Sequence, residues 1–506
     1  RKLVLIGFMG AGKSTAARSA AEALGTRAFD VDRVVEERLG KPVADVFAQD
    51  GEAAFRSAEE QTTLELLDDS AVQVLALGGG ATASQLVRQA LGRHVVVWLD
   101  IGLDTAWDRV AGSGRPLARD RDSFQRLYEQ RQTSYEALAD VTVSGERLES
   151  MPEVLDAIQG LPQGARMLWA ATASSDYPAY VGPGLITQQR FWPATVDGRR
   201  FVVTDGRVAG LYGEAIQPQD GRVVIMPGEQ SKTVAHADIV WTELARAGMT
   251  RQDVVVALGG GVVGDLAGFC AATYQRGVRY VQVPTTLVAQ VDSAYGGKTG
   301  VDLAQAKNYV GAYHQPAAVL SDPGVLQTLP EAERASGYAE VLKTALIAGG
   351  PLWEQIAAGA DPLSVEVIVA CARTKLRVVE RDERDAGLRQ VLNLGHTVGH
   401  AIETVTGYAR YRHGEAVGLG LLVALRLSEL EDLRQQVADL LAAHGLPTRL
   451  EGADPDAVVM ATARDKKRVG EGPVPFVLLE APGRPRVGCE VPPRALIEAV
   501  REVAAS

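Results

Sequence analysis

The sequence predicts an α/β protein in which two parallel-sheet domains are followed by a helical region. Three observations carry this prediction. Apolar strand-like runs alternate with periodic helical segments over roughly the first 160 residues, the alternation resumes near Met167, and long helical patterns replace it from about Val325. Alternation of this kind is typical of parallel sheets that helices cover on both faces.

The first region opens on an apolar run that we expect to be its first strand. The strands expected here are Leu3–Ile6, Val72–Leu77 and His94–Leu99, and the helices between them include Ser14–Leu24 and Ala53–Leu67. A turn-forming stretch, Leu-Pro-Gln-Gly, follows at 161–164. It predicts a domain at 1–162 and a linker at 163–168.

The second region is predicted to hold a Rossmann-like α/β domain at 169–325. Its expected strands are Phe201–Thr204, Arg222–Met226, Asp253–Leu258 and Val278–Pro284. A helical domain is predicted at 326–506, with helices at Ala335–Ala348, Leu363–Arg381, Thr397–Thr404 and Ala416–Leu430.

Composition narrows the classes of function. The chain has 506 residues, which favours more than one domain, and a net charge of -11, which argues against a nucleic-acid partner or a polybasic membrane surface. No apolar run reaches the length of a membrane span. The three cysteines are far apart and form neither a zinc pattern nor a disulfide framework, so we expect a cytoplasmic protein whose partners are small molecules.

Residues Gly7–Ser14, Gly-Phe-Met-Gly-Ala-Gly-Lys-Ser, form a phosphate-binding loop between a strand and a helix. Backbone N–H groups of such a loop surround phosphate oxygens. Lys13 is expected to reach the β- and γ-phosphates of ATP, and Ser14 to ligate Mg²⁺. The predicted nucleotide-binding residues are Gly10, Ala11, Gly12, Lys13, Ser14 and Thr15.

Charged residues downstream indicate the phosphate acceptor. Asp30 and Asp32 are expected to close the next strand, where carboxylates face the ligand crevice. Arg56 and Arg131 are suited to grip a carboxylate, although each taken singly is equally well a solvated surface residue. Arg115 lies in a glycine-flanked stretch and is expected to close on the transferring phosphate.

The second region has its own glycine-rich turn, Gly259–Asp265, after a predicted strand. It satisfies the spacing of a dinucleotide loop, but the acidic residue expected about 20 positions later is absent, and Thr285 and Thr286 stand near that place. A dinucleotide is therefore expected in an unusual mode. Asp265 alone is also explained as a first-turn acid that stabilises its helix.

Three histidines and one glutamate form the strongest cluster of the second region. His396 and His400 share one helix face, His413 follows closely, and Glu340 lies on an otherwise apolar helix. Two imidazoles and a carboxylate are typical of catalytic zinc. Basic residues of the same region suit an anionic substrate, although singly each is more often a surface charge: Arg276, Lys298, Lys307, Lys343, Lys375, Arg389, Lys466 and Lys467.

Over residues 1–160 these motifs, with Glu59, Gly78–Gly80 and Arg131–Tyr135, resemble shikimate kinase. The resemblance implies ATP-dependent phosphorylation of shikimate at its 3-hydroxyl. It implies that shikimate contacts Asp32, Arg56, Gly79 and Arg131, that nucleotide contacts the phosphate loop and Arg115, and that Lys13, Asp32 and Arg115 are catalytic. Another small-metabolite kinase, such as a gluconate kinase, is the alternative for this half.

Over about residues 170–506 the motifs resemble 3-dehydroquinate synthase, a sugar-phosphate cyclase. They include 227–232, Gly259–Asp265, Asp292–Gly300, 393–400 and 413–415. The resemblance implies NAD and a divalent metal, Zn²⁺ or Co²⁺, on Glu340, His396 and His413. Implied NAD-site residues are Asp205, Glu229, Lys232, Gly260, Gly261, Asp265, Thr285, Thr286, Asp292, Lys298, Lys307 and Asn308. Implied substrate residues are Arg276, Lys298, Asn308, Lys343, Lys375, Arg389, Asn393, His400, Lys466 and Lys467; of these, Lys298, Lys343, Arg389 and His400 are expected to be catalytic.

Together the two resemblances imply a bifunctional enzyme of aromatic precursor synthesis. Its second half is expected to convert 3-deoxy-arabino-heptulosonate 7-phosphate to 3-dehydroquinate and phosphate, and to form a homodimer. A sibling cyclase, a polyol dehydrogenase of the same fold, and a non-catalytic sensing module in one half remain as alternatives.

Overall fold

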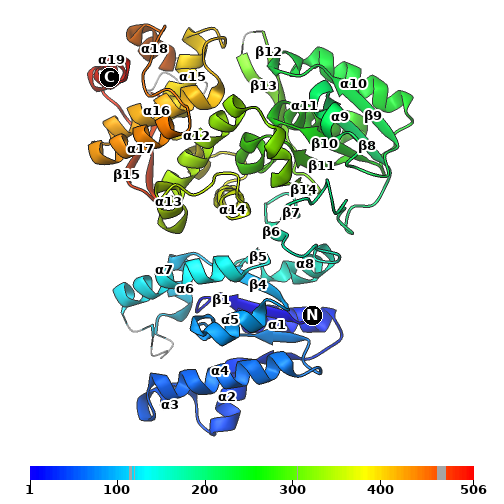
Figure 1. Ribbon diagram of the computed structural model, residues 1–506, viewed down its shortest axis with the longest axis vertical. Coiled ribbons are helices and arrows are strands. Elements are labelled where there is room, and N and C mark those ends of the chain that lie inside the picture. The colour runs from blue at the N-terminus through cyan, green and yellow to red at the C-terminus, as the bar shows by residue number, and fades with distance from the viewer. Residues whose placement is uncertain (113–116, 119, 305, 464–473, 506) are drawn as a thin grey trace. The chain divides into compact units, whose positions relative to one another are not determined.

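The computed structural model describes residues 1–112, 117–118, 120–304, 306–463 and 474–505 (Figure 1). The chain folds as two compact units, which are taken separately below. Unit 1 comprises Arg1–Ala171 and Pro193–Thr195, and unit 2 comprises Thr172–Trp192 and Val196–Ser506. None of the described helices combines the length and apolar composition that a bilayer-spanning segment needs.

Unit 1 is a parallel sheet with the strand order β2-β3-β1-β4-β5-β6. The strands are β1 (Leu3–Gly7), β2 (Ala28–Asp30), β3 (Val74–Ala76), β4 (Val95–Asp100), β5 (Val141–Ser144) and β6 (Arg166–Ala170). The helices are α1 (Lys13–Ala23), α2 (Val31–Leu39), α3 (Val43–Gln49), α4 (Glu52–Asp68), α5 (Gln85–Leu91), α6 (Leu103–Val110), α7 (Arg121–Leu138) and α8 (Met151–Ala157). All five residues of β1 are buried because strands and helices cover it on every side.

Two expectations for unit 1 differ from the structure. The predicted linker 163–168 is partly strand, since Met167 pairs with Val141 and β6 becomes the last strand of this unit. The turn residues at 161–164 connect α8 to β6 instead of ending a domain. Asp32 does not close a strand: β2 ends at Asp30, and Asp32 lies in the first turn of α2 because the Asp30 side chain caps that helix.

Within unit 2 the parallel strands follow the order β7-β14-β11-β10-β8-β9. Its strands are β7 (Tyr177–Val181), β8 (Arg200–Asp205), β9 (Gly221–Ile225), β10 (Val254–Gly259), β11 (Arg279–Pro284) and β14 (Ala318–Ser321). Its helices are α9 (Gly206–Tyr212), α10 (Val234–Arg246) and α11 (Gly261–Thr273), and the hairpin is β12 (Lys298–Leu303) with β13 (Ala306–Tyr313). One apolar core joins the sheet to α10 and α11, through residues such as Phe201, Val240, Val255 and Leu266.

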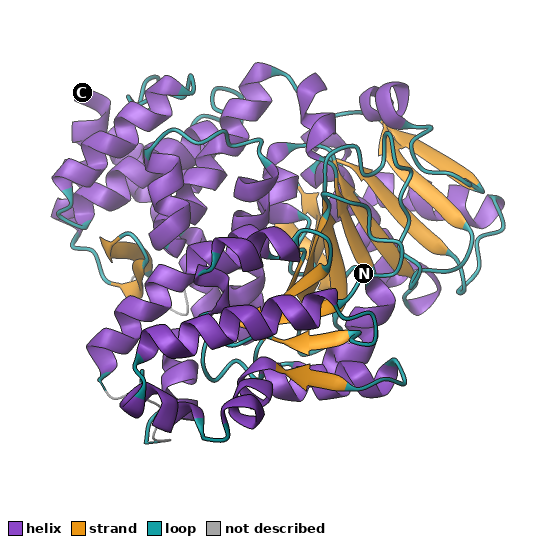
Figure 2. Ribbon diagram, turned by 60° about the horizontal axis from the view of Figure 1, so that its bottom comes forward, coloured by secondary structure: helices purple, strands orange, loops and turns teal. Residues whose placement is uncertain are grey.

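The rest of unit 2 is helical, as expected, and gathers on one side of its sheet in both ribbon views (Figures 1 and 2). The helices are α12 (Glu331–Ala348), α13 (Gly350–Ala357), α14 (Val365–Arg381), α15 (His396–Val405), α16 (His413–Leu427), α17 (Glu431–Ala443), α18 (Pro455–Thr462) and α19 (Pro493–Ala505). A short hairpin, β15 (Phe476–Ala481) with β16 (Arg484–Cys489), interrupts them. The α/β fold class and the helical C-terminal part are thus confirmed.

Asp253 lies just before β10 and forms hydrogen bonds to neighbouring segments at the start of the unit 2 strands. Its carboxylate accepts hydrogen bonds from Arg199 Nη2 at 2.8 Å, Thr250 N at 2.6 Å and Thr250 Oγ1 at 2.9 Å. Burial alone would raise the pKa of Asp253, but these hydrogen bonds lower it to about 2.

Because the folded pKa of Asp253 lies below the ordinary aspartate value, its contribution to stability is complete above about pH 4 and disappears as the pH falls toward 2. We expect Asp253→Asn to destabilise unit 2 by about 1–3 kcal/mol at neutral pH and to flatten this acid dependence. Calorimetric unfolding of both proteins across pH 2–7 measures the difference. If the variant lost stability at low pH as the unaltered protein does, this acid dependence would have to come from other carboxylates.

Candidate active sites

The phosphate-binding loop of unit 1 joins β1 to α1, as predicted. Gly10 and Gly12 have φ angles of 80° and 87°, in the left-handed region that favours glycine. A Cβ on Gly12 would lie 2.4 Å from Leu148 Cδ1, so a larger residue would have to displace Leu148 as well as adopt a left-handed backbone. The sequence therefore folds the loop tightly enough to turn its backbone N–H groups toward an anion at the start of α1.

Lys13 and Ser14 are the residues of this loop that are predicted to contact phosphate and Mg²⁺. The Lys13 ammonium donates to Gly7 O at 2.9 Å and to Phe8 O at 3.2 Å, so it lies over the loop where phosphates bind. Ser14 Oγ is hydrogen-bonded to the Asp30 carboxylate. A hydroxyl beside a carboxylate provides the hard oxygen ligands that Mg²⁺ prefers.

The glycines at 78–80 follow β3 and form the floor of a second group of predicted residues. A Cβ on Gly78 would lie 2.0 Å from Glu59 Oε1 and 2.6 Å from Asp32 Oδ1. A Cβ on Gly80 would lie 2.2 Å from Arg56 Nη1, and one on Gly79 would lie 3.1 Å from Arg131 Nη1. The structure therefore brings Asp32, Arg56, Gly79 and Arg131 together around three residues without side chains.

Two residues that the sequence analysis did not assign support this cluster. Glu59 is buried and pairs with Arg56 at 2.7 Å; desolvation raises the pKa of Glu59 although Arg56 opposes the shift. Tyr135 Oη donates to Gly79 O at 2.6 Å, and desolvation raises the pKa of Tyr135 to about 12. Both residues stood in the quoted motifs, but only the fold shows what they contact. Arg115 lies outside the described residues.

Removal of the Tyr135 hydroxyl is expected to weaken binding of shikimate, the substrate that the sequence resemblance implies for this cluster. Tyr135→Phe leaves the Gly79 carbonyl without this donor beside the predicted substrate residues, a loss of about 1–2 kcal/mol. We expect the KM for shikimate to rise about tenfold and the KM for ATP to stay unchanged. Steady-state kinetics with each substrate varied in turn measures both, and equal rises in the two constants would show a general loss of structure instead.

Unit 2 holds a cavity of about 1500 Å³ at the carboxyl ends of its strands. This is the edge at which ligands bind open parallel sheets. The predicted residues that line it are Asp205, Glu229, Lys232, Gly260, Gly261, Asp265, Thr285, Thr286, Asp292, Lys307, Asn308, Glu340, His400 and His413.

The predicted residues that do not line this cavity are Arg276, Lys298, Lys343, Lys375, Arg389, Asn393 and His396. Lys466 and Lys467 lie outside the described residues. Lys298 is half-exposed and paired with Asp385, and Arg276 ends a short helical turn after α11. Conversely, Ser293, Glu403 and Tyr408 line the cavity without having been assigned.

The wall formed by α11 and its preceding loop brings two predicted cofactor segments together. A Cβ on Gly260 would lie 2.8 Å from Thr286 Cγ2, so the two predicted cofactor segments touch. Buried Lys232 joins this wall through Asp265 Oδ2 at 2.6 Å and Asn308 Oδ1 at 2.5 Å. Burial alone would lower the pKa of Lys232, but Asp265 and Glu229 raise it, so the lysine stays charged.

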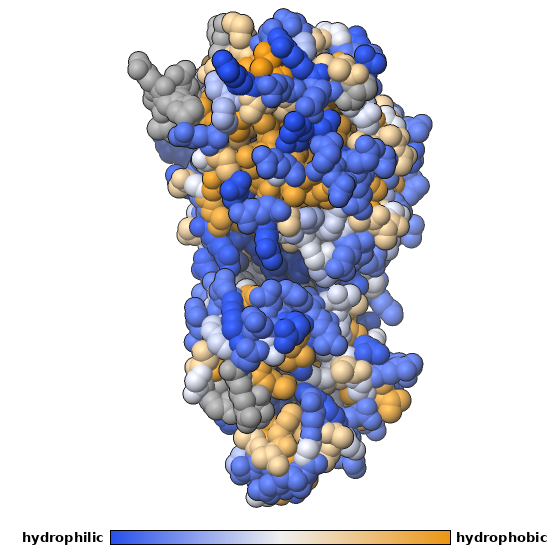
Figure 3. Space-filling model, turned by 90° about the vertical axis from the view of Figure 1, so that its left-hand side faces the viewer, coloured by the Kyte–Doolittle hydropathy of each residue, from blue (hydrophilic) through white to orange (hydrophobic). Residues whose placement is uncertain are grey.

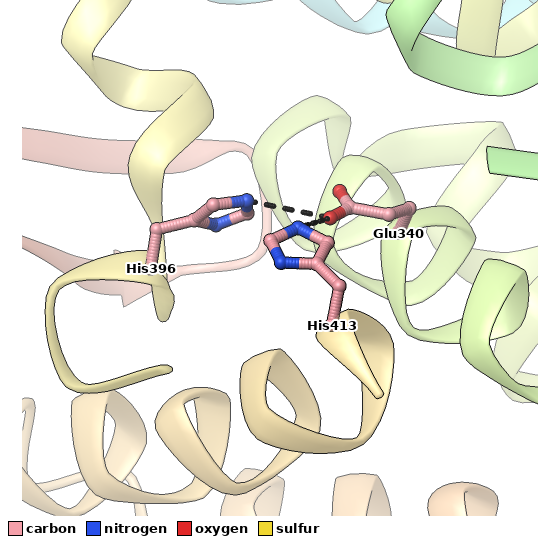
Figure 4. Close-up of side chains that lie close together, drawn as sticks. All are labelled: Glu340, His396 and His413. Carbon is pink, nitrogen blue, oxygen red and sulfur yellow. Dashed lines mark ion pairs between the residues drawn. The ribbon is translucent and has the colours of Figure 1, made fainter. Parts of the chain in front are cut away.

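The predicted metal ligands converge from three helices (Figure 4). Glu340 lies within α12, and His396 and His413 are the first residues of α15 and α16. Glu340 Oε1 is 3.3 Å from His396 Nε2 and 3.2 Å from His413 Nε2, and the three ligand atoms lie within 4.8 Å of one another.

This triad fits a divalent metal. Neither buried oxygen of Glu340 receives a well-directed hydrogen bond, so the carboxylate is left with capacity for an ion. Burial alone would raise the pKa of Glu340, but Lys343 and the two imidazoles hold it well below its ordinary value. Burial lowers the pKa of His396, which keeps that imidazole neutral and able to coordinate.

Behind the triad lies a buried network of basic residues. Lys343 Nζ is 2.6 Å from Glu340 Oε2 and 3.2 Å from Asp292 Oδ2, and Lys375 Nζ contacts the Asp292 carboxylate and donates to its backbone carbonyl at 2.6 Å. Burial alone would raise the pKa of Asp292, but the two lysines lower it to about 2. Arg389, also buried, donates to Gly296 O at 3.0 Å. Nothing in the sequence pattern indicates that these cations lie behind cavity-lining carboxylates.

Comparisons with known families agree with this division. Residues 9–159 match the family described as shikimate kinase. Residues 222–336 match 3-dehydroquinate synthase N-terminal, and residues 337–468 match 3-dehydroquinate synthase C-terminal.

Individual relatives point the same way for unit 2. The 3-dehydroquinate synthase of Halorhodospira halophila is 43% identical over 358 residues, covering 67% of this chain and 99% of the relative. That of Symbiobacterium thermophilum is 44% identical over 354 residues, covering 64% and 98%. A solved 2-epi-5-epi-valiolone synthase from Streptomyces hygroscopicus, with NAD⁺ and Zn²⁺ bound, is 27% identical with a TM-score of 0.60, covering 66% of this chain and 98% of that one.

Proposed function

The chain belongs to the 3-dehydroquinate synthase family and carries a shikimate kinase domain ahead of it, and on this premise we propose which residues perform each reaction. The protein is a bifunctional enzyme of the shikimate pathway. A sibling cyclase is not favoured, because relatives with at least 43% identity are dehydroquinate synthases, whereas the valiolone synthase is 27% identical. A non-catalytic module is not favoured either, because the ligand triad is assembled.

In the kinase half, we assign phosphate transfer to the loop and its neighbours. Lys13 exchanges its bonds to the loop carbonyls for the β- and γ-phosphates, and Ser14 holds Mg²⁺ with ATP. Asp32 accepts the shikimate hydroxyl and takes up its proton, while Arg56 and Arg131 bind the shikimate carboxylate. The observation that supports this assignment is their convergence on Gly78–Gly80.

In the synthase half, we assign NAD to the cavity wall formed by Gly260, Gly261, Thr285 and Thr286, and a zinc ion, or cobalt, to Glu340, His396 and His413. The valiolone synthase carries NAD⁺ and Zn²⁺, which supports this choice. When bound, these groups supply a transient oxidation of the substrate alcohol and polarise its oxygen, which acidifies the neighbouring C–H.

The chain's own residues place the heptulosonate phosphate. Asp292 and Glu340 line the cavity, and Lys343 and Lys375 pair with them from behind, so this wall does not repel an anionic substrate as two unpaired carboxylates would. His400 lies in the cavity and its ring is 5.3 Å from that of His396, close enough to move a proton on the substrate without being a metal ligand. The geometry of the triad beside this cavity is the observation that carries the assignment.

We further propose that the synthase half forms a homodimer and that the enzyme works in the cytoplasm. On the face shown in Figure 3, apolar residues gather in a broad band across the helical part of unit 2. A second copy would remove such a surface from water. Sedimentation at twice the chain mass of 53.8 kDa supports the dimer, and sedimentation at the mass of one chain refutes it.

A further inference from the structure

Glu403 is a buried carboxylate beside the metal triad to which no role has been given above. It lies on α15 with a side chain that is 7% exposed, and it lines the cavity. Its Oε2 is 3.1 Å from His413 Nδ1, and its Oε1 is 3.7 Å from Lys307 Nζ. A buried carboxylate is costly unless it is paired, so these two contacts account for its presence here.

The hydrogen bond between Glu403 and His413 can run in only one direction, from the imidazole N–H to the carboxylate. A carboxylate that faces the Lys307 ammonium is in its charged form and offers only acceptor oxygens. Two acceptors 3.1 Å apart would repel each other, so His413 Nδ1 carries the hydrogen and donates it. Nε2, which faces Glu340 at 3.2 Å, is therefore the nitrogen that is left to coordinate a cation there.

His396 is held in the same way by a weaker partner. Its Nδ1 is 3.2 Å from the carbonyl oxygen of Leu394, which can only accept, so its Nε2 also faces Glu340. Both imidazoles thus have an oxygen on Nδ1 and direct Nε2 toward Glu340. Only His413 receives a charged oxygen, which makes its Nε2 the better donor to a cation.

We propose that Glu403 is a positioning residue that fixes the tautomer and ring orientation of His413 and thereby strengthens metal binding by the triad. This inference rests on the proposed assignment of Glu340, His396 and His413 as the metal ligands. Glu403 also links that site to Lys307, which lies 3.8 Å from Glu229 and 4.2 Å from the centre of the Tyr408 ring. The Glu403 carboxylate therefore contacts both His413, in the first turn of α16, and Lys307, on β13.

A competing role for Glu403 is direct coordination. His400, Glu403 and His413 also place ligand atoms within 4.8 Å of one another and would hold a second ion. The two roles differ in stoichiometry: an orienting carboxylate leaves one metal per chain, whereas a ligand requires two.

The test uses the full chain and measures zinc affinity by competition with a chromophoric chelator, with the Co²⁺ absorption spectrum as a second readout. We expect one metal per wild-type chain, zinc binding weakened about 10–100-fold in Glu403→Ala, and a smaller loss in Glu403→Gln, whose amide oxygen still accepts from Nδ1. The Co²⁺ spectrum of Glu403→Ala is expected to shift, because a reoriented imidazole changes the ligand field.

Glu383→Gln is the matched control, because Glu383 is a buried carboxylate of the same unit that pairs with Ser174 and Gln315, away from the triad. It should retain wild-type zinc affinity. Unchanged affinity and spectrum in Glu403→Ala overturn the inference, as does the loss of one of two bound ions. If instead Glu340→Ala retains tight zinc, the ligand assignment itself fails, which separates the two claims.

Discussion

Replacement of Lys13 by alanine is expected to lower ATP-dependent phosphorylation of shikimate by about 10³-fold, because one preorganised cation at the transferring phosphate is worth this much. The ammonium now donates to the carbonyl oxygens of Gly7 and Phe8 inside the loop, and no other described lysine bonds there. The loss should fall on kcat more than on the KM for shikimate, since the shikimate residues lie after β3 and on α2, α4 and α7.

The measurement is a coupled ADP assay on the variant and on Lys41→Ala, a control in the same unit. Lys41 pairs with Asp50 and touches neither the loop nor the glycine floor. We expect the control to keep the wild-type rate and both proteins to keep synthase activity. Full-rate phosphorylation by Lys13→Ala would disprove the assignment of the phosphate loop.

Replacement of Glu340 by alanine is expected to remove tight zinc and to lower dehydroquinate formation by at least about 10³-fold. A bound metal supplies several kcal/mol of charge stabilisation, and about 4 kcal/mol corresponds to this factor. The variant also leaves Lys343 with Asp292 as its remaining carboxylate partner among the described contacts. Glu340→Gln keeps the side-chain volume and separates metal loss from misfolding.

Metal analysis after gel filtration, phosphate release from the heptulosonate phosphate, and shikimate phosphorylation give the three readouts. We expect both variants to lose zinc and synthase activity and to keep kinase activity, because the triad lies wholly in unit 2 and the phosphate loop in unit 1. Stoichiometric tight zinc in Glu340→Ala would show that the ligand set is wrong.

Features written in short local motifs were predictable from the sequence. The phosphate loop needs glycines at fixed spacing, and His396 and His413 begin two helices whose apolar patterns were visible in advance. The structure places these histidines next to Glu340, and it confirms the α/β class.

Features that depend on packing between distant segments were not predictable. The strand at Arg166–Ala170 exists because β5 offers it a pairing edge, a partner that the local turn signal at 161–164 does not reveal. Glu403 was an ordinary helical glutamate in the sequence, and only the approach of α16 to α15 places its carboxylate against His413. Likewise, the positions of Lys343 and Lys375 behind Asp292 follow from the fold of α12 and α14 around a π-helical turn, Ala289–Ser293.

The two reactions are not consecutive, since further steps separate dehydroquinate from shikimate, so transfer of one product to the other site is not available to the enzyme. Each site should therefore work alone when given its own substrate. Synthase activity therefore serves as the control for the Lys13 variant, and kinase activity serves as the control for the Glu340 variants.

The central claim is that one chain carries both activities, and a single set of incubations tests it. The purified full chain is given shikimate with ATP and Mg²⁺ in one vessel and 3-deoxy-arabino-heptulosonate 7-phosphate with NAD⁺ and Zn²⁺ in another, and the products are identified by mass spectrometry. We predict shikimate 3-phosphate in the first and 3-dehydroquinate with equimolar phosphate in the second. The absence of either product, or a carbocycle other than dehydroquinate, would contradict the account.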